Sequence, residues 1–260
     1  MRDVDSKAAV LLVVVAVGVL AAGLTGCGSA TPTAPPAVLI FEADEAAGAG
    51  EGATRARVAS SAIYPRGPVV FRGTRFDERT PDATGERIEL RRSGDGADGV
   101  FTDTLFVLDD DDERLVRTNR FRRDAHGAVV LLATTNHEQR STAMYEPPLV
   151  GAEAGGVGRD GVETASAVSI DDKSAGEATM RVVYVGDEMV EVGGVQVRAA
   201  RLETTFVLKP RPAVRVERSF VRWIAAVDAG PARTVRERTH EVIRAGPITV
   251  SERRFVDVWE

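Results

Sequence analysis

The sequence contains a single cysteine, Cys27, among its 260 residues. A chain with one cysteine forms no intramolecular disulfide, and no second thiol remains to build a catalytic pair or a cysteine metal site. We therefore expect neither a disulfide framework nor thiol chemistry in the folded part of the protein.

Histidine is almost as scarce, with three residues. His137-Glu138 begins like the helix of a zinc protease, but Ser141 stands where the second histidine ligand is required, one helical turn further on. His126 falls in an expected turn and His240 on an expected polar strand. We interpret all three as surface histidines and predict no metal site.

Recognised catalytic motifs are also absent. No G-x-S-x-G turn occurs in the chain. The formal dinucleotide fingerprint at Gly48–Ala53 does not directly follow a strand, and Pro65 and Pro68 leave no room for the crossover helix that such a site needs. We predict a protein that is not an enzyme and has no cofactor. A hydrolase with an unrecognised site is kept as an alternative, because carboxylates are plentiful.

The net charge is −6 at pH 7, which argues against general nucleic-acid binding. The charge is uneven, since Arg198–Arg254 holds 13 basic and 6 acidic residues. The preferred interpretation is that arginines alternating with apolar residues form the water-facing side of each strand. The other interpretation is an anionic partner for this half of the chain.

The N-terminus does carry a clear pattern. Arg2 and Lys7 precede an apolar run from Ala8 to Leu20, which has the length of a secretory signal core and falls short of the roughly 20 residues of a membrane span. This pattern predicts export and cleavage.

Leu24-Thr25-Gly26-Cys27 resembles the lipobox of bacterial lipoproteins. The resemblance implies cleavage after Gly26, a signal peptide over residues 1–26, and attachment of a diacylglyceryl group with chains such as palmitate to Cys27. Gly28 in the next position implies the outer membrane, where the organism has one and follows the enteric rule. The alternative is an uncleaved membrane helix that buries Cys27, which the glycines around the cysteine disfavour.

Residues 27–37 are Pro-rich and predict a flexible, lipid-anchored tether, and residues 38–260 predict a single β-rich envelope domain. Short apolar runs broken by turn residues predict an all-β domain of antiparallel meanders. The expected strands are Val38–Glu42, Val69–Phe76, Glu86–Arg91, Val100–Leu108, Leu115–Arg122, Ala128–Thr134, Met180–Val192, Val195–Leu208, Val214–Ala225, Ala232–Ile243 and Ile248–Trp259.

Several turns and breaks accompany these strands. Gly193-Gly194 is suited to the positive φ angles of a two-residue hairpin turn. Asp109–Glu113 fails as a calcium loop, because arginines stand at positions 114 and 120, and it predicts a solvated hairpin tip. Met144–Pro148 is expected to interrupt the sheet, and Gly151–Gly161 to be a flexible connection. Pro210 and Pro212 are expected to end their strand.

The strand after Gly194 has a clear parity. Ala200, Leu202, Phe206 and Leu208 share one side with the polar exception Thr204, while Arg201 and Glu203 occupy the other. Period 2 assigns the first set to a covered face and the second set to water.

The second half of the chain also resembles an uncharacterised family of secreted bacterial β-sheet proteins. The resemblance covers about Leu115–Glu260 and rests on short motifs: His126-Gly127 before Val129-Val130-Leu131, Tyr145-Glu146-Pro147-Pro148-Leu149, Val192-Gly193-Gly194 with Ala199 beyond, and Trp223 ahead of Gly230. Asp228 replaces the second glycine that is usual between Trp223 and Gly230. The resemblance implies a strongly curved sheet, half-barrel or incomplete barrel, and no assigned activity.

These observations predict a lipid-anchored protein of the bacterial cell envelope that faces the periplasm or the exterior. Its expected role is non-enzymatic binding or scaffolding, with the membrane as a partner through Cys27 and a hydrophobic or anionic envelope ligand as a second partner. The alternative is a periplasmic carrier for lipid or lipoprotein acyl chains in a half-barrel cavity.

Overall fold

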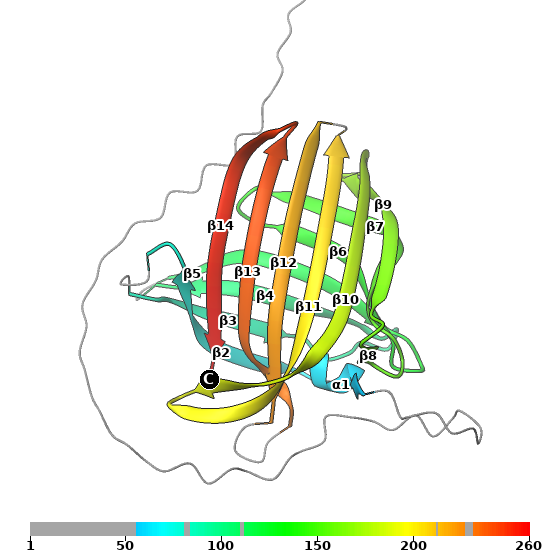
Figure 1. The fold of residues 1–260 in the computed structure, drawn as a ribbon. Coiled ribbons are helices and arrows are strands. Elements are labelled where there is room, and N and C mark those ends of the chain that lie inside the picture. Colours follow the sequence, from blue (N-terminus) through cyan, green and yellow to red (C-terminus); the bar gives the residue numbers. More distant parts are fainter. Residues whose placement is uncertain (1–55, 81–83, 110–111, 212, 227–230) are drawn as a thin grey trace, which may run out of the picture.

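The protein folds into a closed antiparallel β-barrel of twelve strands (Figure 1). The computed structural model describes residues 56–80, 84–109, 112–211, 213–226 and 231–260. The expected signal peptide, the lipobox Leu24–Cys27, the tether and the strand Val38–Glu42 lie outside these residues. Within the described part, no helix has the length and hydropathy of a membrane span.

The elements are β1 (Arg57–Val58), α1 (Ser60–Ile63), β2 (Val69–Asp77), β3 (Glu86–Arg92), β4 (Val100–Leu108), β5 (Glu113–Arg123), β6 (Val129–Asn136), β7 (Ser141–Ala152), β8 (Val157–Gly158), β9 (Val162–Ile170), β10 (Lys173–Val192), β11 (Val195–Arg211), β12 (Val214–Ala225), β13 (Arg233–Ala245) and β14 (Ile248–Trp259).

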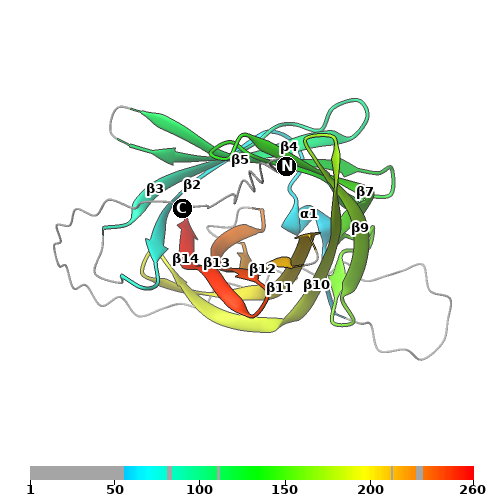
Figure 2. The ribbon, with the colours of Figure 1, turned by 90° about the horizontal axis from the view of Figure 1, so that it is seen from above.

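The strands follow one another around the barrel in chain order, except that β1 and β8 form a separate two-stranded sheet. The ring closes where β14 pairs with β2, with Phe255 opposite Asp77 and Trp259 opposite Gly73. Seen from above, the strands run around a ring, and α1 lies at its inner side (Figure 2). Closure pairs the outer backbone groups of β2 and β14, which an open sheet would leave as edges.

The all-β antiparallel prediction is therefore confirmed, but the half-barrel or incomplete barrel is wrong. The error lies between residues 141 and 170, where the sequence predicted a break and a flexible connection. The structure has the continuous strand β7 and the additional strand β9, which pairs with β7 on one side and β10 on the other. These two strands supply the wall that completes the ring.

Prolines do not interrupt β7 because they sit at an irregularity of the ladder. β6 pairs Leu131 with Leu149 and Ala133 with Met144, so four residues of β7, with Pro147 and Pro148 among them, bulge opposite one residue of β6. A bulge tolerates residues that lack a backbone N–H. The Glu146–Pro147 peptide bond is cis. Pro210 likewise lies within β11 at a register shift rather than after the strand.

Most of the remaining strand predictions fit closely, but β10 begins at Lys173, before the predicted start at Met180. Val100–Leu108, Val214–Ala225 and Ile248–Trp259 have the predicted bounds. Gly193 and Gly194 take φ angles of 58° and 80° between the paired residues Val192 and Val195, which confirms the two-residue hairpin turn. Leu108 pairs with Glu113, so β4 and β5 form a hairpin at the position predicted for the acidic segment.

The covered face of β11 is the interior of the barrel. Ala200, Leu202 and Phe206 are buried, and the polar exception Thr204 points the same way. The opposite residues, Arg201 and Glu203, form an outward ion pair of 2.6 Å. The period-2 assignment of this strand is confirmed.

The core has three parts. The largest lies inside the barrel and contains aromatic and aliphatic side chains such as Phe101, Leu149 and Ile224. A second group lies around Trp259 and Ile88 beside the closing seam. The third lies on the outside, where the long β10–β11 hairpin packs Val190 and Val197 against Trp223 of β12.

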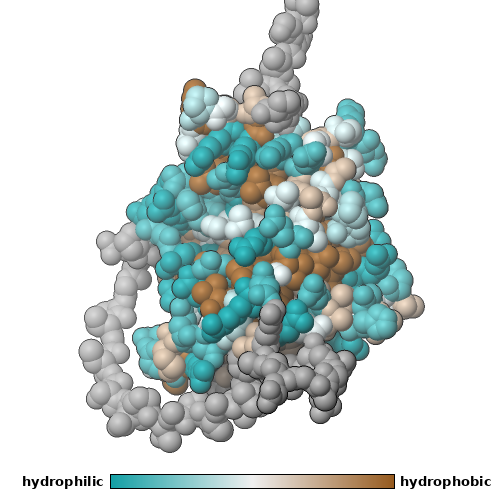
Figure 3. Space-filling model, turned by 45° about the vertical axis from the view of Figure 1, so that its right-hand side comes forward, coloured by the Kyte–Doolittle hydropathy of each residue, from teal (hydrophilic) through white to brown (hydrophobic). Residues whose placement is uncertain are grey.

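The outer face carries cross-strand ion pairs, such as Arg91 with Glu113 and Arg198 with Asp187. The face seen in Figure 3 is largely hydrophilic, with hydrophobic areas near its middle. Outward charges on neighbouring strands thus complement one another, as the sequence predicted for the arginines of Arg198–Arg254. The prediction holds for those that point outward.

The closing seam can be tested at Gly73. A Cβ added there would lie 2.2 Å from the carbonyl oxygen of Val258 and 3.0 Å from the ring of Trp259. We expect Gly73→Ala to lower the free energy of unfolding by about 1–3 kcal/mol in urea titrations, because the seam must open to admit the methyl group.

Gly94→Ala is the matched control, since the nearest heavy atom to its added Cβ is 3.4 Å away, in Pro68. This variant should stay within about 0.5 kcal/mol of the wild type. Equal stability of the two variants would show that β2 and β14 do not approach each other as described.

Candidate functional site

The barrel encloses a chamber with a volume of about 80 Å³. Its walls come from β5, β6, β7, β10, β11 and β12, and its floor from Ile63 and Tyr64. Apolar side chains supply half of the lining, and the rest is polar. The polar and charged lining residues are Tyr64, Arg117, Asn119, Thr134, Tyr145, Thr204, Arg218 and Arg222.

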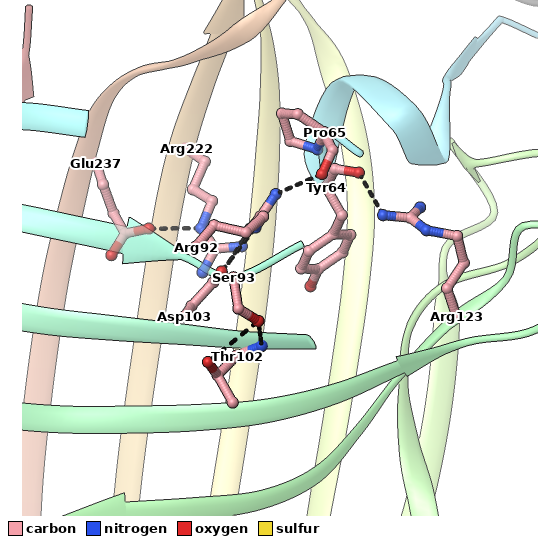
Figure 4. A network of polar contacts seen from close by, with 9 residues as sticks. All are labelled: Tyr64, Pro65, Arg92, Ser93, Thr102, Asp103, Arg123, Arg222 and Glu237. Carbon is pink, nitrogen blue, oxygen red and sulfur yellow. Dashed lines mark hydrogen bonds and ion pairs between the residues drawn. The ribbon is translucent and has the colours of Figure 1, made fainter. Parts of the chain in front are cut away.

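The floor is built by the N-terminal plug, which we define as residues 57–65. The Tyr64 ring lies 5.2 Å from Phe121 and 6.3 Å from Phe101, centroid to centroid. Arg123 donates a hydrogen bond of 2.8 Å to the Tyr64 carbonyl, and Arg92 donates one to the carbonyl of Pro65 (Figure 4). Two arginines from the barrel wall thereby hold the plug in the mouth.

Both of these arginines are themselves paired. Arg92 forms a bidentate pair with Asp103, with distances of 2.6 and 2.5 Å, and both side chains are buried. Arg123 pairs with Asp95 at 2.9 Å. Because the fork of a guanidinium has donors left after binding one carboxylate, each arginine can also bind a plug carbonyl.

Above the plug, one wall of the interior is charged. Arg222 of β12 pairs with Glu237 of β13, as Figure 4 shows, and Arg218 pairs with Glu241 one layer further along the same two strands. The next two strands continue the layer. Arg75 of β2 binds Asp257 of β14 through two hydrogen bonds of 2.8 Å.

Glu237 is ionised within this wall. Burial opposes its ionisation, but the ion pair and hydrogen bond with Arg222, together with the charges of Arg117 and Arg75, outweigh it. The pKa of Glu237 is consequently held below its ordinary value of 4.5. Arg222 also lies close to the side chain of Tyr64, so the charged wall reaches down to the plug.

Arg117 reaches the chamber from β5, on the opposite wall. It makes no hydrogen bond or ion pair with any residue that the structure describes. Burial lowers the pKa of Arg117, and the nearby charge of Arg218 lowers it further, while Glu237 acts in the opposite direction. The side chain is half-buried and lines the chamber.

Neutral hydrogen-bonding groups complete the lining. Thr134 donates to the side-chain oxygen of Asn119 at 3.1 Å, and it also contacts the hydroxyl of Tyr145. Burial raises the pKa of Tyr145, so this phenol remains a neutral donor. The chamber therefore offers cationic and neutral donors next to apolar surface.

The residues weighed from the sequence do not meet in a site. His126 lies in the exposed turn before β6, His137 contacts Thr118, and His240 pairs with Glu252. Among the described residues, no group of three or more histidine, cysteine, aspartate or glutamate side chains is placed to hold a metal ion. Cys27 and Leu24–Gly26 lie outside the described residues.

The chamber residues were missed because their arginines were assigned to the water-facing side. That assignment is wrong for Arg218 and Arg222, which face the interior. A usable signal existed, since Arg218, Phe220 and Arg222 share one parity on β12. Parity alone did not show that this face lies on the same side of the sheet as the covered face of β11.

Comparisons with known proteins add no further assignment. No family model, no curated protein and no solved structure matches this chain.

The charged wall makes a prediction for Glu237. Glu237→Gln leaves Arg222, Arg117 and Arg75 with less negative charge to offset them, so we expect a loss of about 3–5 kcal/mol in the free energy of unfolding at pH 7. Because the folded pKa lies below the ordinary one, the stabilisation by Glu237 is full above about pH 4.5 and is lost as the pH falls through the folded pKa.

Urea titrations between pH 7 and pH 3 measure both effects. The variant should show a shallower loss of stability on acidification than the wild type, by up to about 1.4 kcal/mol per pH unit. Glu203→Gln serves as control, because its carboxylate is 41% exposed and outward. If the free energy of unfolding of Glu237→Gln fell with acidification as steeply as that of the wild type, Glu237 would not be ionised and paired in the folded protein.

Proposed function

We propose that this protein is a lipid-anchored, non-enzymatic binding protein of the bacterial cell envelope, and that it holds a small ligand inside the barrel. The observation that carries the proposal is the chamber above the plug. Ligand sites in proteins are concave, largely apolar and equipped with a few placed polar groups. The chamber has this combination, with side chains such as Phe206 and Phe220 beside Arg117 and Thr204.

The charges of the interior support binding rather than catalysis. Glu237, Glu241 and Asp257 are each held by an arginine. A general base needs a carboxylate or imidazole free to accept a proton from the substrate. Carboxylates that are held in arginine pairs at neutral pH do not meet this need, so they support a binding site better than a catalytic one.

The size of the chamber favours a small ligand over an acyl-chain carrier. Pockets for drug-sized ligands have volumes of roughly 300–1,000 Å³, whereas this chamber has about 80 Å³. The plug bounds the chamber at one end, and the closed ring of strands bounds it laterally. The carrier for full-length lipid chains is thus the weaker proposal.

The ligand can be sought directly. Native mass spectrometry of the full chain, purified from its own membranes, should show a mass increment that is released on denaturation. Thr204→Leu fills the chamber with a larger side chain at a position that points inward, and it should abolish the increment while the protein stays folded.

Thr205→Leu is the matched control, because Thr205 is the next residue on β11 and points outward. This variant should keep the ligand. Retention of the same increment by Thr204→Leu, or a wild-type protein that carries no ligand after gentle purification, would refute binding within the chamber.

The anchor is tested separately at Cys27. If the lipobox is used, Cys27→Ala removes the acylated thiol, so we expect the protein to lose palmitate labelling and to leave the membrane fraction or remain unprocessed. The β domain should fold unchanged, because the chain has no other cysteine. Normal processing with an unchanged membrane fraction would contradict the anchor.

A further inference from the structure

Three arginines line the chamber, and one of them, Arg117, has no paired carboxylate among the described residues. Three arginines at mid-barrel each have a carboxylate: Arg75 with Asp257, Arg218 with Glu241, and Arg222 with Glu237. Arg117, from the facing wall, has none among the described residues. A largely buried charge without a paired carboxylate destabilises the fold, and Glu237 offsets the charge of Arg117 only from a distance. Arg117 would therefore stabilise an anion bound in the chamber.

The surroundings of Arg117 define what kind of anion fits. On one side, Asn119, Thr134 and Tyr145 supply neutral polar groups. On the other side, Phe206 and Phe220 supply apolar surface. A ligand that fills this space needs an anionic end and an apolar end.

We propose that the chamber binds a small organic monocarboxylate, with its carboxylate on Arg117 and its short carbon chain against Phe206 and Phe220. This inference rests on the proposed binding function and names the ligand class. The planar fork of a guanidinium matches the two oxygens of a carboxylate. A single unpaired arginine in the chamber lining favours a monoanion, and a volume of about 80 Å³ limits the ligand to a few carbon atoms.

Butyrate and butyramide separate charge from shape. The two molecules have nearly the same size, but only butyrate is an anion. Isothermal titration of the full chain with sodium butyrate should show one binding site, and butyramide should bind at least 10-fold more weakly. Sodium phosphate and sodium chloride at equal ionic strength test whether the apolar end contributes, and both should bind more weakly than butyrate.

Arg117→Met tests the residue. It keeps the length of the side chain and removes the charge, so butyrate affinity should fall about 10- to 100-fold, the range for a lost hydrogen bond to a charged group. Arg117→Lys keeps the charge but lacks the planar fork, so its affinity for butyrate should lie between those of the wild type and Arg117→Met. Arg120→Met, at an exposed position of the same strand, is the control and should bind as the wild type.

Thermal unfolding of the ligand-free variants excludes a merely structural role. Since Arg117 has no carboxylate partner, Arg117→Met should unfold at a temperature at least as high as the wild type. Arg75→Met leaves Asp257 unpaired and should unfold at a lower temperature. A lower unfolding temperature for Arg117→Met with undiminished butyrate binding would overturn the proposal.

The other outcomes are equally decisive. Equal affinity for butyrate and butyramide, or equal affinity for butyrate and chloride, overturns the monocarboxylate. If native mass spectrometry finds a neutral ligand that Thr204→Leu displaces, this inference fails and the binding function stands. If it finds no ligand and butyrate does not bind, both fail.

Discussion

Closure of the sheet is the constraint on which the rest of the structure depends. Once β14 pairs with β2, and β9 joins β7 to β10, the inward side chains of twelve strands share one enclosed space. Charges that would be harmless on an open sheet then require partners, because burial removes their hydration. The bidentate Arg75–Asp257 pair, which joins the two closing strands on the inside, meets this need at the seam itself.

The need to pair buried charges also divides the interior along the barrel axis. The plug fills one end with Ile63 and Tyr64 against an aromatic cluster, and arginines from the wall bind its carbonyl groups. Beyond it the chain places arginine–carboxylate pairs on β12 and β13 rather than more apolar core. Buried pairs of this kind give little net stability compared with apolar packing. They give this part of the interior a polar wall beside the apolar packing around the plug.

Local pattern was enough to place most strands and their turns. The alternation in Val100–Leu108 and Ile248–Trp259 gave the bounds of β4 and β14, and Gly193-Gly194 gave the tight hairpin. β9 was missed because its inward positions include Thr164 and Ser166, which do not form an apolar stripe. β7 was missed because its prolines are tolerated only at a bulge, and a bulge is defined by the partner strand.

The sequence by itself determined that the chain forms antiparallel strands with two chemically distinct faces, and it predicted a secreted, lipid-anchored protein from residues 1–27. Only the tertiary structure decided which face points inward on each strand. Period 2 separates Arg218 and Arg222 from Glu217 and Val221, but it is symmetric between inside and outside. The register of β11, β12 and β13 breaks that symmetry, and closure brings Arg117 across from them to create the chamber.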